Sequence, residues 1–114
     1  MAKGYAQRPG YDYVKMHSPV VHLETIRLIL AIAATKGLVI QQMDVKGAYL
    51  NGVLEEKIYM RQPEGFEDRT NCICELIRSL YGLKQSGHAW NIEFDRAMWR
   101  HGFRRMRSDP YMYI

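Results

Sequence analysis

Apolar residues recur at helical spacing in two stretches of the chain. The first stretch places one apolar face along residues 18–36, made by Leu23, Ile26, Leu30 and Ala33. Ser18-Pro19 supplies a plausible cap and first turn, and Gly37 supplies a stop signal directly after Lys36. The pattern therefore predicts a helix from Ser18-Pro19 to about Lys36.

The second helical stretch lies near the end of the chain. Its apolar positions are Trp90, Phe94, Ala97 and Met98. These positions predict a long amphipathic helix from about Gln85 to His101, with Gly102 as its stop signal.

Three shorter segments have the composition of strands. Leu38 to Val45 is an apolar run with Asp44 near its C-terminal end, which predicts a buried strand. Lys57 to Gln62 alternates apolar and polar residues before the turn at Pro63-Glu64-Gly65. A third strand is predicted around Cys72 to Leu76.

The remaining segments complete the predicted architecture. Residues 1–17 are typical of an irregular entry segment, whereas Tyr111 to Ile114, after the bend at Asp109-Pro110, is typical of the opening of a strand. Strands that alternate with helices indicate an α+β or α/β fold, in which a small sheet is packed by two helices.

The composition fits an ordinary globular chain of 114 residues, 47% hydrophobic and 25% charged. Its longest apolar stretch, Leu28 to Ala34, is far shorter than the ~20 residues that span a bilayer, so we expect no membrane helix. The first residues lack the apolar core of a secretory signal, which favours an intracellular protein, cytoplasmic or nuclear. Cys72 and Cys74 are expected to be buried and reduced.

The net charge is only +4, but positive charge is concentrated near the C-terminus. Residues 96–107 contain no acidic residue and include five arginines: Arg96, Arg100, Arg104, Arg105 and Arg107. Such a cluster is a candidate surface for a polyanion. It is also what the solvated face of a helix and its exit loop contain, and the charge run alone favours this second interpretation.

Asp44 is the first candidate for a functional role, because an acid at the end of an apolar strand is costly to bury unless it binds a cation or finds donors. The alternative is that its carboxylate accepts backbone N–H groups around Gly47 and caps the next helical turn. On its own, the residue pattern favours the cap.

A series of sequence blocks resembles the copia-type LTR-retrotransposon reverse transcriptases. Residues 42–52, Gln-Met-Asp-Val-Lys-Gly-Ala-Tyr-Leu-Asn-Gly, are similar to motif A of that family. Further blocks follow the family in order and spacing, namely residues 2–5, 18–21, 23–27, 54–66, 74–76 and 79–90. The resemblance covers nearly the whole chain and therefore implies an RNA-directed DNA polymerase.

The resemblance implies a partial right-hand polymerase, with a fingers-like segment and helix at residues 1–37 and a palm-like segment at residues 38–114. In that family Mg²⁺ ions held by carboxylates assist the attack of the primer 3′-hydroxyl on an incoming nucleotide. Asp44 would be the motif A catalytic metal ligand and the Val45 carbonyl an additional ligand. Tyr49 would pack under the nucleotide sugar and exclude a 2′-hydroxyl, although a core aromatic is the plainer alternative.

The block that begins at Ser79 carries the remaining expected contacts. Gln85 falls where the family has its motif B glutamine, which supports the incoming nucleotide and the template base, while a polar residue at a helix start is an equal alternative. Lys84 and His88 flank it and could touch backbone phosphates, but solvated side chains are more common at such positions. The family often has Arg in place of His88, and Arg is the better phosphate clamp.

The family's Tyr-x-Asp-Asp turn is absent from these residues, and the acidic pairs Glu55-Glu56 and Glu67-Asp68 are expected in polar, loop-like contexts. We therefore expect a fragment that is inactive as a polymerase by itself. RNA/DNA template-primer and dNTP are the partners that the resemblance implies. The alternatives are a non-catalytic nucleic-acid-binding remnant or an inert relic of a transposable element. A strand from Tyr111 without a hairpin partner would leave a bare sheet edge that promotes self-association.

Overall fold

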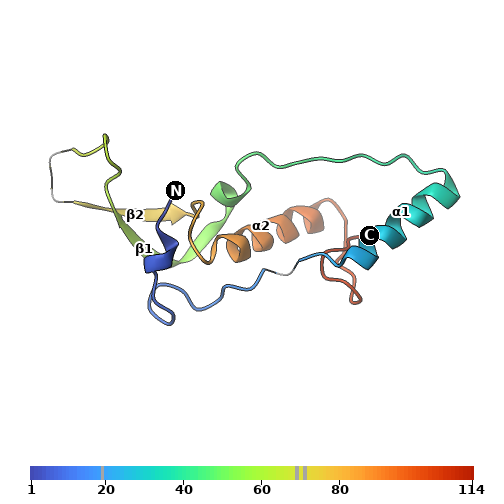
Figure 1. Ribbon diagram of the computed structural model, residues 1–114, viewed down its shortest axis with the longest axis horizontal. Helices are drawn as coiled ribbons and strands as arrows, with labels where there is room; N and C mark the ends of the chain where they lie inside the picture. Colours follow the sequence, from blue (N-terminus) through green and yellow to red (C-terminus); the bar gives the residue numbers. More distant parts are fainter. Residues whose placement is uncertain (19, 69, 71) are drawn as a thin grey trace. The chain divides into compact units, whose positions relative to one another are not determined.

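The structure is a computed structural model that describes residues 1–18, 20–68, 70 and 72–114. Its elements, in chain order, are η1 (Gly4–Ala6), α1 (Leu23–Lys36), η2 (Ala48–Asn51), β1 (Val53–Arg61), β2 (Ile73–Arg78) and α2 (Ser86–Arg100) (Figure 1). Helices and an antiparallel sheet occur in separate stretches, which confirms the α+β class. No helix in the described residues is long and apolar enough to cross a membrane.

The chain forms two compact units, each built from two separate stretches of sequence. Unit 1 contains Met1–His17 and Gly47–Glu93, and unit 2 contains Ser18–Lys46 and Phe94–Ile114. The sheet and the first half of α2 belong to unit 1, whereas α1 belongs to unit 2. The two helices and the small antiparallel sheet of the expected architecture are both present. The assignment of residues 1–37 to fingers and 38–114 to palm stays a prediction.

The sheet of unit 1 is the pair of strands that the sequence predicts. β1 and β2 run antiparallel and side by side, with Ile58 opposite Leu76 and Met60 opposite Cys74 (Figure 1). β1 begins four residues before the predicted Lys57, and its pairing is irregular between Val53 and Ile58. Ile58 is buried, as expected for the inward position of an alternating strand.

A close backbone approach joins the N-terminal segment to the loop that follows β2. The Ala2 N–H donates to the Tyr81 carbonyl at 2.8 Å. A Cβ added to Gly4 would lie 1.8 Å from the Gly82 carbonyl oxygen, and one added to Gly82 would lie 2.1 Å from the Ala2 oxygen. Gly82 also has a φ of 100°, which L side chains rarely adopt. Only glycine at both positions allows these two segments to touch.

A buried carboxylate in unit 2 connects two distant parts of the chain. Asp109 is only 3% exposed and accepts hydrogen bonds from the Thr25 hydroxyl at 2.6 Å and from the Tyr111 N–H at 2.9 Å. The first bond connects α1 to the C-terminal segment, 84 residues further along the chain. The Thr25 hydroxyl, followed by the Tyr111 N–H, lowers the pKa of Asp109 below its ordinary value.

A second polar cluster ties the C-terminal segment to α2. The Asp95 carboxylate accepts from the Arg105 guanidinium at 3.0 Å and from the Tyr113 hydroxyl at 2.9 Å. The Tyr113 ring also meets Phe94 edge-on, with centroids 5.8 Å apart. Since Asp95 and Phe94 lie on α2, this cluster fixes the last residues of the chain against that helix.

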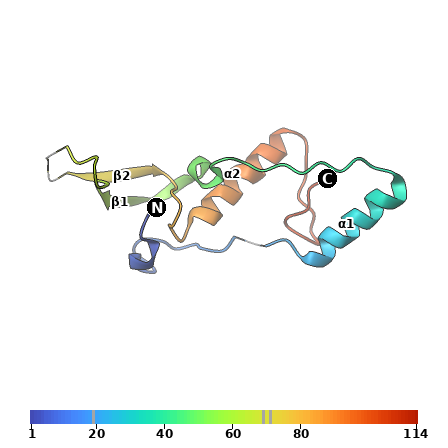
Figure 2. The same ribbon diagram turned by 45° about the horizontal axis from the view of Figure 1, so that its top comes forward.

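The predicted strand at Leu38–Val45 is wrong. These residues form no strand and run as an extended trace after α1, visible in Figure 2. Val39 is 88% exposed and Met43 is 87% exposed, so the predicted burial is absent too. A strand needs a neighbour for its N–H and C=O groups, and no described segment pairs with this one.

The predicted strand at Tyr111 is also corrected. Residues 111–114 form no strand, but a single antiparallel bridge joins Tyr113 to Arg105. Arg104 and Ile114 exchange backbone hydrogen bonds of 2.7 and 3.0 Å, so this stretch is already paired along one edge. The partner, which the sequence pattern did not reveal, is the segment at Arg104 to Met106.

The structure also corrects the start of α1 and the expected burial of the two cysteines. α1 begins at Leu23 rather than at Ser18, and Pro19 lies outside the described residues. Gly37 does end this helix, with a left-handed φ of 62°. Cys72 and Cys74 are free thiols as expected, but Cys72 is exposed and Cys74 half-buried. The predicted burial of both is therefore wrong.

We predict that Gly4→Ala destabilises unit 1 by about 3 kcal/mol or more, because the new methyl overlaps a backbone carbonyl that has no side-chain freedom to move away. The measurement is urea denaturation followed by circular dichroism. Gly65→Ala is the control: its φ is 84° but its Cβ would meet nothing within 4 Å, so only backbone strain of about 1 kcal/mol applies. Equal costs for the two variants would contradict the close approach.

Thr25→Val should raise the pKa of Asp109 toward the ordinary value of about 3.9. Because the folded-state pKa is lowered, the carboxylate stabilises the fold above the unfolded-state value, and this contribution is lost as the pH falls through the lowered pKa. The variant should lose stability at neutral pH and show a weaker dependence below about pH 4. Carboxyl NMR titration and melts at several pH values test this. Thr35→Val, which removes a hydroxyl bonded within α1, should leave the Asp109 pKa unchanged.

Candidate functional site

Asp44 and Val45 lie in the exposed extended segment between α1 and η2. The short helix that follows has no side-chain cap hydrogen bond, and its N-terminal residue Gly47 turns the chain with a φ of 63°. The capping role that was the alternative for Asp44 therefore has no support in this structure. The carboxylate is accessible to a ligand, and its role as a metal ligand stays a prediction.

Tyr49 lies on η2, immediately after the turn at Gly47. Its ring is half-buried and packs against Tyr81, with the centroids 4.8 Å apart and the planes tilted by 48°. Tyr81 comes from the loop after β2 and was not singled out in the sequence. This ring contact restricts the orientation of Tyr49, as a steric barrier under a sugar would require. Its contact with a nucleotide stays a prediction.

Gln85 is 2% exposed, immediately before α2. Its Nε2 donates to the Asp12 carbonyl at 3.0 Å, and its Oε1 accepts from the Gln7 amide at the same distance. Gln7 also accepts from the Lys84 N–H through its Oε1, at 2.9 Å. The side chain expected to contact a nucleotide is thus hydrogen-bonded to the N-terminal segment. Neither Gln7 nor Asp12 was singled out in the sequence, because nothing in a single sequence connects positions more than 70 residues apart.

Lys84 and His88 are both half-buried and both contact the N-terminal segment. The Lys84 ammonium donates to the Tyr13 hydroxyl at 3.3 Å and lies 5.2 Å from the centre of that ring. His88 Nδ1 is 3.1 Å from the His17 carbonyl oxygen, a distance at which its protonated Nδ1 donates. Neither side chain is simply solvated, although a contact with phosphate stays a prediction.

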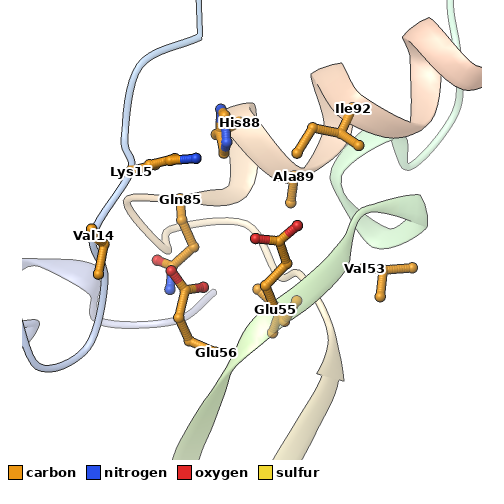
Figure 3. Close-up of a pocket in the computed structure, with 10 residues that line it drawn as sticks. Val14, Lys15, Val53, Glu55, Glu56, Gln85, His88, Ala89 and Ile92 are labelled. Atoms are coloured by element: carbon orange, nitrogen blue, oxygen red, sulfur yellow. The ribbon is translucent and has the colours of Figure 1, made fainter.

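A cavity of about 250 Å³ opens beside the start of α2, within unit 1. In Figure 3 the carboxylates of Glu55 and Glu56, from β1, lie on one side of it, and Lys15 and His88 lie together on the other. The loop-like context expected for Glu55-Glu56 is therefore wrong, since both residues belong to the strand. The cavity combines charges of both signs with an apolar wall, and Lys15 is a basic residue at its edge that the sequence did not highlight.

The arginine cluster is only partly available for a ligand. Arg105 is paired with Asp95, and the Arg104 guanidinium lies 4.9 Å from the centre of the Trp99 ring and donates to the Trp99 carbonyl at 3.3 Å. Arg100 and Arg107 are exposed. The cluster therefore has both structural members and members that face solvent, so the two interpretations of the charge run each apply to some of it.

Comparisons with known proteins identify the family of this chain. The family described as reverse transcriptase (RNA-dependent DNA polymerase) matches residues 1–114. The chain is 45% identical to the retrovirus-related Pol polyprotein from transposon TNT 1-94 of Nicotiana tabacum and 42% identical to that from transposon RE1 of Arabidopsis thaliana, in each case over 100% of the chain. It is 36% identical to the truncated transposon Ty1-A Gag-Pol polyprotein of Saccharomyces cerevisiae over 79% of the chain. No solved structure matches the chain significantly.

The chain belongs to the reverse transcriptase family, as represented in the Pol polyproteins of copia-type retrotransposons. It covers 9%, 8% and 7% of the three relatives named above, so it corresponds to a small part of each of them. The sequence blocks around Asp44 and Gln85 therefore gave the correct family.

Reverse transcriptases generally depend on Mg²⁺, which carboxylate side chains hold. The described residues offer few such side chains in one place. They contain no group of three His, Cys, Asp or Glu side chains that could hold a metal ion. Asp44 offers one carboxylate in an exposed segment, and Glu55 and Glu56 belong to the other unit. The residues described here do not by themselves fit a pair of Mg²⁺ ions, which needs several carboxylates.

We predict that nucleic-acid binding by this chain weakens steeply with salt and depends on the solvent-facing arginines of the cluster at residues 96–107. Arg107→Ala should reduce the slope of log K against log salt for single strands by about 0.7, because one phosphate contact is lost. Arg61→Ala, which removes an exposed arginine from β1, should leave the slope unchanged. Fluorescence anisotropy with labelled oligonucleotides measures both. A strong sequence preference, or an unchanged slope for Arg107→Ala, would contradict a backbone contact.

Proposed function

We propose that this chain forms part of the fingers and palm of an RNA-directed DNA polymerase that carries out template-directed deoxynucleotidyl transfer. The single observation that carries the proposal is the family match over residues 1–114, which includes Asp44, Val45 and Tyr49 in one uninterrupted block. The geometry supports it, since Asp44 is exposed and Tyr49, five residues further along the chain, packs against Tyr81.

In the proposed reaction the primer 3′-hydroxyl transfers its proton to solvent and attacks the α-phosphorus of a deoxynucleoside triphosphate. A new phosphodiester bond forms, the bond to the β-phosphate oxygen breaks, and pyrophosphate leaves. Asp44 and the Val45 carbonyl are proposed as ligands in a Mg²⁺ site that further carboxylates must complete. The ring of Tyr49 would exclude a ribonucleotide by occupying the volume of its 2′-hydroxyl.

Lys84 and His88 are proposed to lie along the template-primer. The Lys84 ammonium already contacts Tyr13, so Lys84 is proposed to contribute mainly by holding its own segment in place. His88 and Lys15 both line the cavity, and Lys15 adds a positive charge to it (Figure 3). The direct nucleotide contact predicted for Gln85 stays a prediction, because its amide is bonded to Gln7 and Asp12.

A non-catalytic nucleic-acid-binding remnant is the second candidate, and the exposed Arg100 and Arg107 favour it. The two candidates differ in what Asp44 does. In a polymerase its charge is indispensable to catalysis, whereas a remnant that binds through arginines would bind nucleic acid at least as well without that negative charge.

The polymerase proposal is tested with a chimera in which residues 1–114 replace the matching segment of the tobacco TNT 1-94 relative. Template-directed primer extension is expected from the chimera, with a loss of about a thousandfold in Asp44→Asn, as removal of a metal-ligand charge costs several kcal/mol of transition-state stabilisation. Tyr49→Val should instead retain extension and admit ribonucleotides. The 114-residue chain alone should show no incorporation.

The matched controls are the unaltered relative and Gln41→Ala, an exposed position in the same extended segment as Asp44. Full activity of the Asp44→Asn chimera would overturn the assignment of Asp44. An inactive chimera beside an active relative would favour the remnant, provided that the chimera still binds oligonucleotide.

A further inference from the structure

The N-terminal segment is largely irregular, as its sequence indicates, but its own hydrogen bonds close it into a defined loop. After η1, the Arg8 N–H donates to the Asp12 carboxylate at 2.6 Å, and the Gly10 N–H donates to the Tyr13 carbonyl at 3.0 Å. Tyr13 itself is 7% exposed. Residues 8–13 therefore form a closed loop with a fixed end, and this loop presents the Asp12 carbonyl to Gln85.

The Gln7 carboxamide makes two contacts with consecutive residues at the start of α2. Its Oε1 accepts from the Lys84 backbone N–H at 2.9 Å, and its Nε2 donates to the Gln85 side-chain Oε1 at 3.0 Å. These contacts join positions 77 and 78 residues apart. One group thus uses its acceptor and its donor at the same time, which a carboxylate or a hydrocarbon cannot do.

Gln85 is 2% exposed, so water cannot replace a hydrogen-bond partner that its side chain loses. Its oxygen depends on Gln7 and its nitrogen on Asp12. A buried amide that loses a partner incurs most of the desolvation cost of that group, so both contacts are expected to be made whenever α2 starts in this position. The first turn of α2 also carries His88 and Ala89, which line the cavity beside Glu55 and Glu56 (Figure 3).

We propose that Gln7 is a positioning residue that fixes Lys84, Gln85 and the first turn of α2 against the N-terminal segment. Its importance for nucleotide and template rests on the proposed function, but the contact itself does not. In this arrangement Gln85 acts through the bonds that it makes inside the protein, and the start of α2, which lines the cavity, is held by a side chain from the N-terminal segment.

Two substitutions separate the halves of the contact. Gln7→Met keeps the length of the side chain but removes donor and acceptor, so the Lys84 N–H should exchange with solvent about fivefold faster or more, as expected for the loss of one hydrogen bond. Gln7→Glu keeps an acceptor for Lys84 but has no donor for Gln85. It should preserve the slow exchange of the Lys84 N–H and shift the NMR signals of the Gln85 side-chain amide.

The experiment is amide hydrogen exchange by NMR on the 114-residue chain, with the amides of the β1–β2 ladder as the reference for global opening. Gln41→Ala, at an exposed glutamine, should change neither readout. The proposal is supported if Lys84 exchange rises in Gln7→Met beyond any rise in the ladder and is rescued by Gln7→Glu.

The outcomes that overturn the proposal are equally specific. They are an unprotected Lys84 N–H in the unsubstituted chain, an unchanged rate in Gln7→Met, or equal acceleration of Lys84 and of the ladder in both variants. Since no nucleic acid is present, failure here is independent of the polymerase activity measured with the chimera.

Discussion

The contact between the first residues and the loop after β2 is the constraint on which unit 1 depends. Two backbones approach so closely at Gly4 and Gly82 that neither position has room for a side chain. The approach brings Gln7 within hydrogen-bond distance of Lys84 and Gln85, and it places Tyr13 under the Lys84 ammonium. The close approach is a precondition for the other contacts, because the hydrogen bonds of Gln7 can form only if the two backbones touch at these glycines.

Unit 2 uses a different principle, in which a buried charge takes the place of close backbone packing. Asp109 is accompanied by a hydroxyl and a backbone N–H, which offset the cost of removing its carboxylate from water. The Asp95 carboxylate accepts hydrogen bonds from Arg105 and Tyr113. It is more exposed than Asp109, and an exposed ion pair contributes less to the free energy of folding. The helix α2 belongs to both units, since it begins beside Gln85 and carries Asp95 in its second half.

Local patterns predicted the elements that are stabilised locally. The alternation around Ile58 identifies β1, whose neighbour β2 follows along the chain, and the spacing from Trp90 to Met98 identifies α2. The contacts of the candidate site could not be predicted in this way. Gln7 with Gln85 and Thr25 with Asp109 are separated by 78 and 84 residues, and a single sequence contains no signal that relates such distant positions. The sequence shows that residue 4 is a glycine, but a glycine is required there because of the Gly82 carbonyl, 78 residues further along the chain.

The segment around Asp44 shows why an apolar run is not sufficient to make a strand. Val39, Ile40 and Met43 have the composition of a buried strand, yet they are 88%, 59% and 87% exposed. Hydrophobic residues favour burial, but a strand also requires that a neighbouring backbone accept and donate its hydrogen bonds. No described segment does so, and the chain covers less than a tenth of the polyproteins that it resembles. Without such a neighbour among the described residues, the segment stays extended and Asp44 is exposed. No strand pairing fixes Asp44 among the described residues, whereas Gln85 is held in place by its hydrogen bonds to Gln7 and Asp12.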